Sequence, residues 1–183
     1  MKAAILILAL LAAPVTSISP ASPAGAQTSA LKSLDTDAPI DIDAAKIEVQ
    51  DADNQAVASG AVIIRQGEMT LTADTVKVLY KRGTGSPEIQ RLDARGNVHV
   101  TSPTETATGN TGIYDTGAKI ITLVGNVTLD RGGSNLKGQR LVLNLISGQT
   151  SFDGRSGGTS ATPGATPGRV TGRFIVPQRG VKP

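Results

Sequence analysis

The stretch that decides the fold runs from Gly96 to Tyr114 and reads G-N-V-H-V-T-S-P-T-E-T-A-T-G-N-T-G-I-Y. It recurs over residues 125–143 as G-N-V-T-L-D-R-G-G-S-N-L-K-G-Q-R-L-V-L. A further copy over residues 60–78 reads G-A-V-I-I-R-Q-G-E-M-T-L-T-A-D-T-V-K-V. Each copy opens with a Gly, followed by a Val two positions later and an aliphatic residue four positions later. Self-similarity at a period of about 20–50 residues indicates stacked copies of one supersecondary unit.

A small residue lies 13 positions after each opening Gly, namely Ala73, Gly109 or Gly138. A truncated fourth copy places Ala44 at the equivalent position, because Ile42, Ala44, Ile47 and Val49 match Leu71, Ala73, Val76 and Val78. The small residues are therefore spaced by 29, 36 and 29 residues. The longer spacing fits the same unit with seven extra residues near Lys81–Glu88. We expect these small residues to lie in strands where neighbours approach closely.

Apolar and polar residues alternate with a period of two along several segments of the chain. The segments are Ile40–Ala44, Ile47–Val49, Ala61–Arg65, Met69–Ala73 and Thr75–Tyr80. This pattern is typical of strands with one buried face. A Gly before such a strand permits a turn or bulge. The sequence therefore predicts an all-β domain of repeated units of about 29 residues, arranged either as a solenoid or as two facing sheets.

The two ends of the chain differ from this body. Met1–Ala26 has a basic start, an apolar run and a small-x-small site at Ala24–Ala26, which predicts an export signal. Cleavage would leave 157 residues (183 minus 26) without cysteine, which suits the bacterial periplasm. An uncleaved membrane anchor is the alternative. Residues 27–38 are polar and small, and we expect a flexible leader there.

The predicted β domain covers residues 39–153, and residues 154–183 form a Gly/Pro-rich tail. From residue 27 to 153 there are 12 basic and 15 acidic residues, a net of −3, whereas the tail has five basic residues and no acid. We expect the tail to be flexible; within it, Val170–Val176 fits a short strand, a docking peptide or an incidental apolar patch. The basic pI thus belongs to the tail. With two Phe, two Tyr and no Trp, the chain lacks aromatic platforms for nucleic acid, and we predict no such partner.

The sequence offers little for catalysis, a cofactor or a metal. The one histidine, His99, alternates with Val98 and Val100 and is expected to face solvent. Asp41 with Asp43, or Asp51 with Asp53, could be calcium ligands or paired carboxylates, but exposed acids on an edge strand are the ordinary explanation. Phosphate-binding loops, metal-binding histidine pairs and nucleophile motifs are missing from the sequence. We predict a protein that is not an enzyme and uses no cofactor.

The inward positions of the strands are rich in aliphatic residues, so two facing sheets that do not close would enclose an apolar groove for acyl chains. The predicted lining residues are Val62, Ile64, Val76, Val78, Val98, Val100, Val127, Leu129, Leu141 and Leu143. The alternative is that the same side chains fill a dry core. Periodicity alone does not separate these two interpretations.

The units beginning at Gly96 and Gly125, with the preceding L-T-A-D-T-V-K-V, resemble the OstA-type domain of the periplasmic lipopolysaccharide-transport bridge family, LptA. The resemblance covers about Pro39–Asp153. It implies an open, twisted β-jelly roll that holds the acyl chains of lipid A, the membrane-anchored part of lipopolysaccharide. It also implies two partners, an LptC-like inner-membrane component and the N-terminal domain of LptD.

The same resemblance implies head-to-tail self-association through free strand edges, which we expect near Ile40–Val49 and Leu141–Phe152. Two other functions stay open at this point. One is a structural β-repeat protein with dry sheets that only assembles. The other is an LptC-like anchored component, which would require the export signal to remain uncleaved.

Overall fold

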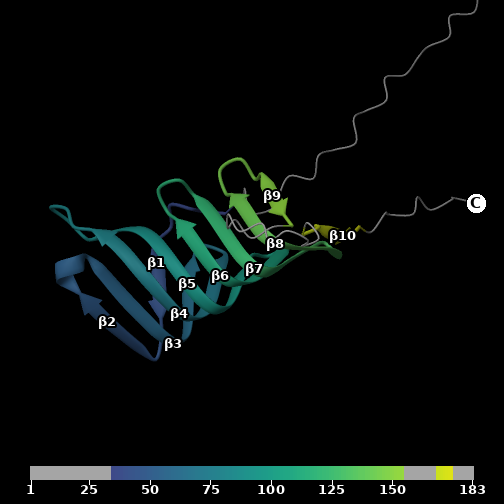
Figure 1. Cartoon of the computed structure of the whole chain (residues 1–183). Coiled ribbons are helices and arrows are strands. Elements are labelled where there is room, and N and C mark those ends of the chain that lie inside the picture. The colour runs from purple at the N-terminus through teal and green to yellow at the C-terminus, as the bar shows by residue number, and fades with distance from the viewer. Residues whose placement is uncertain (1–33, 155–167, 175–183) are drawn as a thin grey trace, which may run out of the picture.

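The computed structural model describes residues 34–154 and 168–174. The predicted export signal Met1–Ala26 lies outside these residues, as do residues 27–33 of the leader and most of the tail. The described residues form one antiparallel sheet of ten strands, which confirms the predicted all-β class (Figure 1). In chain order the strands are β1 (Ile40–Asp43), β2 (Lys46–Gln50), β3 (Gln55–Gln66), β4 (Met69–Lys81), β5 (Glu88–Thr101), β6 (Glu105–Asp115), β7 (Ile120–Arg131), β8 (Ser134–Asn144), β9 (Thr150–Asp153) and β10 (Thr171–Arg173), with a 3-10 turn η2 (Asp51–Asp53) after β2.

The opening glycines of the repeat are β-bulges that bend the sheet. Gly60, Gly96 and Gly125 have φ of 83°, 74° and 83°, and the residue after each also has positive φ. The register of β3, β5 and β7 with their neighbours shifts at these positions. Bulges of this kind bend a strand and increase its twist. Because the three bulges lie on alternate neighbouring strands, they form one line along which the whole sheet folds.

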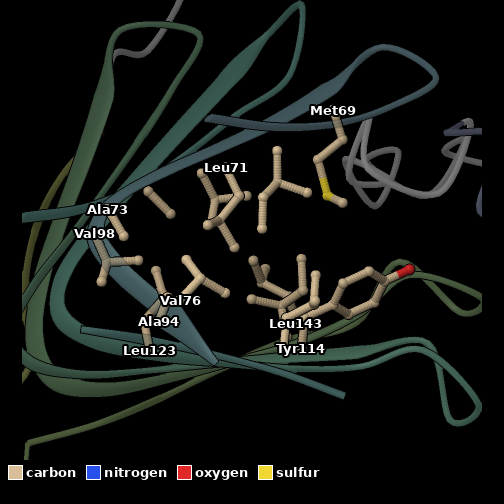
Figure 2. Close-up of a cluster of buried hydrophobic side chains, with 14 of the residues drawn as sticks. Met69, Leu71, Ala73, Val76, Ala94, Val98, Tyr114, Leu123 and Leu143 are labelled. Carbon is tan, nitrogen blue, oxygen red and sulfur yellow. The ribbon is translucent and has the colours of Figure 1, made fainter. Parts of the chain in front are cut away.

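This fold line divides the long strands into two facing layers. The first layer contains residues 63–66 of β3, 69–72 of β4 and 98–101 of β5, together with β1. The second layer contains residues 55–59 of β3, 75–81 of β4 and 88–95 of β5, together with β2. Figure 2 shows Leu71 and Met69 in the first layer, opposite Leu123 and Tyr114 in the second. The layers meet at Ala73 and Val98, so the open, jelly-roll-like form is confirmed over a solenoid.

The small residues of the repeat lie in strands where neighbours approach closely, as predicted, and they lie beside the bulges. Ala73, Gly109 and Gly138 each pair with the Val that follows a bulge on the preceding strand: Val62, Val98 and Val127 respectively. A Cβ added at Gly138 would lie 3.1 Å from the ring of Phe152, and one at Gly109 would lie 3.3 Å from the Leu123 Cβ. A larger side chain at the fold line would therefore push the layers apart.

At its first edge the sheet ends in two short strands. β1 and β2 both pair with β3, and the Ala45 amide donates to the Gly60 carbonyl at 3.0 Å between them. Together they occupy the place of a single long strand interrupted at Ala44–Ala45. Ile42 therefore lies in the first layer and Ile47 in the second, like Leu71 and Val76, which confirms the truncated fourth copy.

The last edge differs in part from the prediction, because only the end of the predicted range Leu141–Phe152 lies in the outer strand. Leu141 and Leu143 are not free, because β9 pairs with β8 from Arg140 to Leu143. The outermost strand of the second layer is therefore β9. In the first layer, Asn135–Lys137 of β8 pairs with β10, so the tail adds a strand there. The strand interpretation of Val170–Val176 is confirmed for Thr171–Arg173, and Ile175 and Val176 lie outside the described residues.

The leader also differs from the expected loose segment where it is described. Leu34 is 8% exposed and belongs to the core. Residues 34–38 pack across the turn between β3 and β4, because Gly67 leaves room for the Asp35 backbone and for Ala38. An apolar Leu at the start of this segment gives it a face to bury, which the polar composition of the leader conceals.

Candidate functional site: the apolar interior

The antiparallel register aligns the inward side chains in rows that cross the sheet. On the second layer Val76 lies opposite Ala58 and Ala94, and Val78 lies opposite Ala56 and Leu92. The two rows continue across β6 and β7 to Leu141 and Leu143 on β8. These leucines lie opposite Phe152 and Thr150 of β9. A corresponding row on the first layer contains Ile42, Ile64, Leu71, Val100, Ala107, Leu129 and Leu136. The interior is thus apolar from one edge of the sheet to the other.

All ten residues predicted to line the groove face this interior, and none is more than 4% exposed. Four of them, Val76, Val78, Leu141 and Leu143, come from the second layer; the others come from the first layer and the fold line. Their neighbours along the strands face the other way: His99 is exposed, and Lys77, Thr128 and Val142 are half-buried. The predicted alternation is therefore confirmed as a burial pattern.

Sequence reasoning missed a further part of the interior, contributed by the strand halves before each bulge. Leu92 and Ala94 precede Gly96 by four and two residues, and Ile121 and Leu123 precede Gly125 in the same way. All four are buried at 1% exposure or less. The signal was present, since each repeat extends four residues upstream of its Gly.

The side of the interior opposite the fold line is a mouth between the two rims of the folded sheet. One contact that joins the two layers across this mouth is polar and buried: the Tyr114 hydroxyl on β6 donates to Gln66 Oε1 on β3 at 2.8 Å. Burial, followed by the nearby Asp37 carboxylate, raises the pKa of Tyr114 to about 12, so its hydroxyl stays protonated. The mouth is therefore closed here by a neutral hydrogen bond.

A second contact between the two layers lies nearer the last edge of the sheet. Arg131 at the end of β7 forms an ion pair with the buried Glu105, with Nε 2.7 Å from Oε1. Its Nη2 also donates to the Thr150 hydroxyl of β9 at 3.1 Å, which links the first layer to the second. These side chains of Glu105 and Arg131 form the polar border of the apolar interior on this side.

The first edge leaves part of the inner surface uncovered. Ile47 and Val49 lie opposite Ala58 and Ala56 on the inward face of β2. They are nevertheless 50% and 61% exposed, because the opposite layer does not extend over them. The apolar surface therefore continues beyond the covered interior at this end of the sheet.

The acidic residues that the sequence offered as candidates for catalysis or metal binding make ordinary structural contacts or face solvent. Asp51 accepts from the Tyr80 hydroxyl at 3.0 Å and pairs with Arg82, and these two contacts lower its pKa in that order. Asp41 and Asp43 are exposed on the outer face of β1. Over residues 34–154 and 168–174, His, Asp and Glu form no group of three or more able to hold a metal. In the same ranges, no helix is long and apolar enough to cross a membrane.

A folded antiparallel sheet around an apolar interior, with polar groups confined to its rims and outer face, defines the class of open β-roll domains. Residues 41–149 match the family model described as the LptA/(LptD N-terminal domain) LPS transport protein. The chain belongs to this family, as the repeat indicated.

Two individual proteins are similar to the chain. An uncharacterised protein of Rhizobium meliloti (strain 1021) is 32% identical over 130 residues, which covers 68% of this chain and 70% of the relative. The crystal structure of LptH, the LptA-homologous periplasmic component of the lipopolysaccharide transport device of Pseudomonas aeruginosa, superposes with a TM-score of 0.67. That match covers 78% of this chain and 99% of LptH at 19% identity, and it confirms the fold.

Proposed function

We propose that the protein is a periplasmic bridge component that carries lipopolysaccharide from the inner to the outer membrane, with the acyl chains of lipid A held between the two layers. The observation that carries this proposal is the apolar surface that crosses the sheet from β1 to β8 and continues onto the exposed Ile47 and Val49. Each methylene transferred from water into such a surface contributes about 0.8 kcal/mol. Several acyl chains would therefore supply ample binding energy without any polar contact.

The proposal requires the layers to separate, because the interior side chains cover one another. Val62, Val76 and Leu141 have 0% exposure. The family membership and the predicted export signal support the periplasmic location, and the transport role needs no catalytic step. The proposed partners are an LptC-like inner-membrane component, the N-terminal domain of LptD and further copies of this chain, joined through the sheet edges.

The test is site-specific photocrosslinking to purified lipopolysaccharide. Probes at the interior positions Val100, Leu141 and Leu143 are expected to capture the lipid. Probes at the outward positions His99 and Val142 are expected to capture at least tenfold less. Val142 is the matched control, because it is apolar and lies between the two interior leucines on β8. Equal capture at Val142 and Leu143 would contradict a lipid-specific inner face.

The near-zero exposure of the interior favours one alternative, a structural β-repeat protein with a dry core that only assembles. No capture at any interior position, in a protein shown to be folded, would select that alternative. An LptC-like anchored component is tested separately by mass spectrometry of the mature protein. An N-terminus at Gln27 would exclude it.

A further inference from the structure

The described part of the leader, residues 34–38, lies across the mouth of the roll; we call it the strap. The Leu34 side chain is 8% exposed and packs with the core. The strap then passes the β3–β4 turn on the first rim, where a Cβ added at Gly67 would lie 3.3 Å from the Asp35 carbonyl oxygen. It continues directly into β1. One short segment thus connects the core, the first rim and the first edge.

Gln66 holds the strap to the first rim. Its side chain is buried, with 4% exposure for the residue. The Nε2 group donates to the Thr36 carbonyl at 2.8 Å and to the Ala38 carbonyl at 3.1 Å, while Oε1 accepts from Tyr114. A single glutamine therefore joins the strap, the first layer and the second layer. Its donors would be left unpaired in an apolar place if the strap departed without water replacing it.

Lys119 holds the strap to the second rim. It lies in the turn between β6 and β7, and its Nζ donates to the Thr36 carbonyl at 2.5 Å and to Asp37 Oδ1 at 3.1 Å. Asp37 itself is 90% exposed, so this ion pair is weak. A cavity of about 360 Å³, lined in part by Thr36, Asp37 and Lys119, lies beside the strap. The strap is thus held on its inner side by Gln66 and Lys119, while the cavity leaves open space beside it.

From this geometry we propose that the strap is a closure over the mouth, and that it must leave Lys119 and withdraw Leu34 before an acyl chain enters sideways between the rims. This inference rests on the proposed lipid-carrying function. In the closed state Leu34 occupies part of the apolar interior that an acyl chain would fill. Lipid entry and strap docking are therefore mutually exclusive at this end of the mouth.

The experiment compares two double variants of the mature chain. L34S/K119A removes the buried side chain and the contact with the second rim, whereas L34M/K119R keeps an apolar side chain and the charge. Uptake of purified lipopolysaccharide is followed by the rate of photocrosslinking at Val100. We expect L34S/K119A to take up lipid at least tenfold faster than the wild-type protein, which corresponds to about 1.4 kcal/mol in the barrier. We expect L34M/K119R to match the wild type.

A second measurement follows the strap directly. The chain has no cysteine, so an environment-sensitive dye on T36C reports only on the strap. Lipid addition should shift its emission toward that of a dye in water, and should leave unchanged a dye on G85C, where an added Cβ meets no atom within 4 Å. Equal uptake rates in all variants, or an unshifted T36C signal during lipid capture, would overturn the strap while leaving the carrier function intact. Absence of capture in the wild type would overturn both.

Discussion

Gly125 illustrates how a single residue holds the fold line. Its φ is 83°, and a Cβ there would lie 2.8 Å from the Asn110 Nδ2 atom. Gly132, in the turn between β7 and β8, also has positive φ, at 53°, but a Cβ there meets no atom within 4 Å. Left-handed backbone costs an L-residue about 1–2 kcal/mol, so G132A should lose that amount. G125A should lose about 1 kcal/mol more, because Asn110 must move.

Urea denaturation of both glycine variants measures this difference. The comparison isolates crowding at the bulge from the backbone cost that the two positions share. Equal losses of unfolding free energy would show that Asn110 adapts freely and that the bulge tolerates a side chain.

Tyr114 makes stability depend on pH at the alkaline end. Its pKa in the folded protein is raised to about 12 by burial and by Asp37, against about 10 for an unfolded tyrosine. The folded state therefore retains the proton more strongly, and this contribution is complete below pH 10 and lost as the pH rises toward 12. The free energy of unfolding should fall by about 2 kcal/mol across this window. Y114F should lack this part of the decrease when both proteins are titrated by urea denaturation.

Residue patterns predicted the interior well because a strand has only two faces. Because Val98 and Val100 face inward, His99 between them must face outward. Residues that lie opposite one another on neighbouring strands point to the same face, so the same alternation holds across the sheet. The polar closure of the mouth could not be predicted in this way. Gln66, Tyr114 and Lys119 are distant in sequence, and nothing local to any of them indicates that the folded sheet brings their side chains to one place.

Among the strands, β10 is the one held least firmly by strand pairing and burial. It pairs over three residues with Asn135–Lys137 of β8, and its residues are all exposed. Truncation after Asp153 should therefore leave a domain that unfolds cooperatively, with a loss of unfolding free energy below about 1 kcal/mol. Loss of a single cooperative transition in urea would show instead that the tail strand is integral to the sheet.

The same truncation uncovers the edge of β8 in the first layer. Unpaired strand edges accept further strands, so the truncated protein should self-associate more strongly than the full chain. Light scattering over a concentration series measures this, and an unchanged molar mass would contradict a capping role for β10. The last edge was the least predictable part of the sheet, because β9 and β10 have only four and three residues and carry almost no periodic signal. Only tertiary pairing assigns β9 and β10 to β8.

For the whole molecule, the two ends of the first layer carry opposite charge on the outer face. Asp41 and Asp43 lie on β1, whereas Lys137 and Arg173 lie on β8 and β10. Head-to-tail association of copies would bring these groups together, and exposed charges are screened within about 10 Å at 0.1 M salt. We therefore expect open-ended oligomers that shrink as salt rises, as followed by light scattering. A closed dimer, or oligomers insensitive to salt, would contradict this arrangement.

A proline in the outermost strand of the second layer tests the same contact. T150P should limit growth by removing a backbone donor from the free side of β9, because the Asn144 amide donates to the Gln149 carbonyl and the next residue, Thr150, points its own amide away from β8. A proline at Val142 or Leu143 is unsuitable, because both residues are paired on two sides and the monomer itself would suffer. Oligomers of unchanged size in a folded T150P protein would show that β9 is not the joining edge.

The line of bulges can serve as a hinge about which the two layers rotate relative to each other. The strand ladders run within each layer and meet only at that line, so widening the angle between the layers leaves them paired. The polar contacts across the mouth and the contacts between inward side chains are what would break. For the proposed lipid carrier this means a capacity that is not fixed, because lipids with different numbers or lengths of acyl chains would be accommodated by different widths of opening.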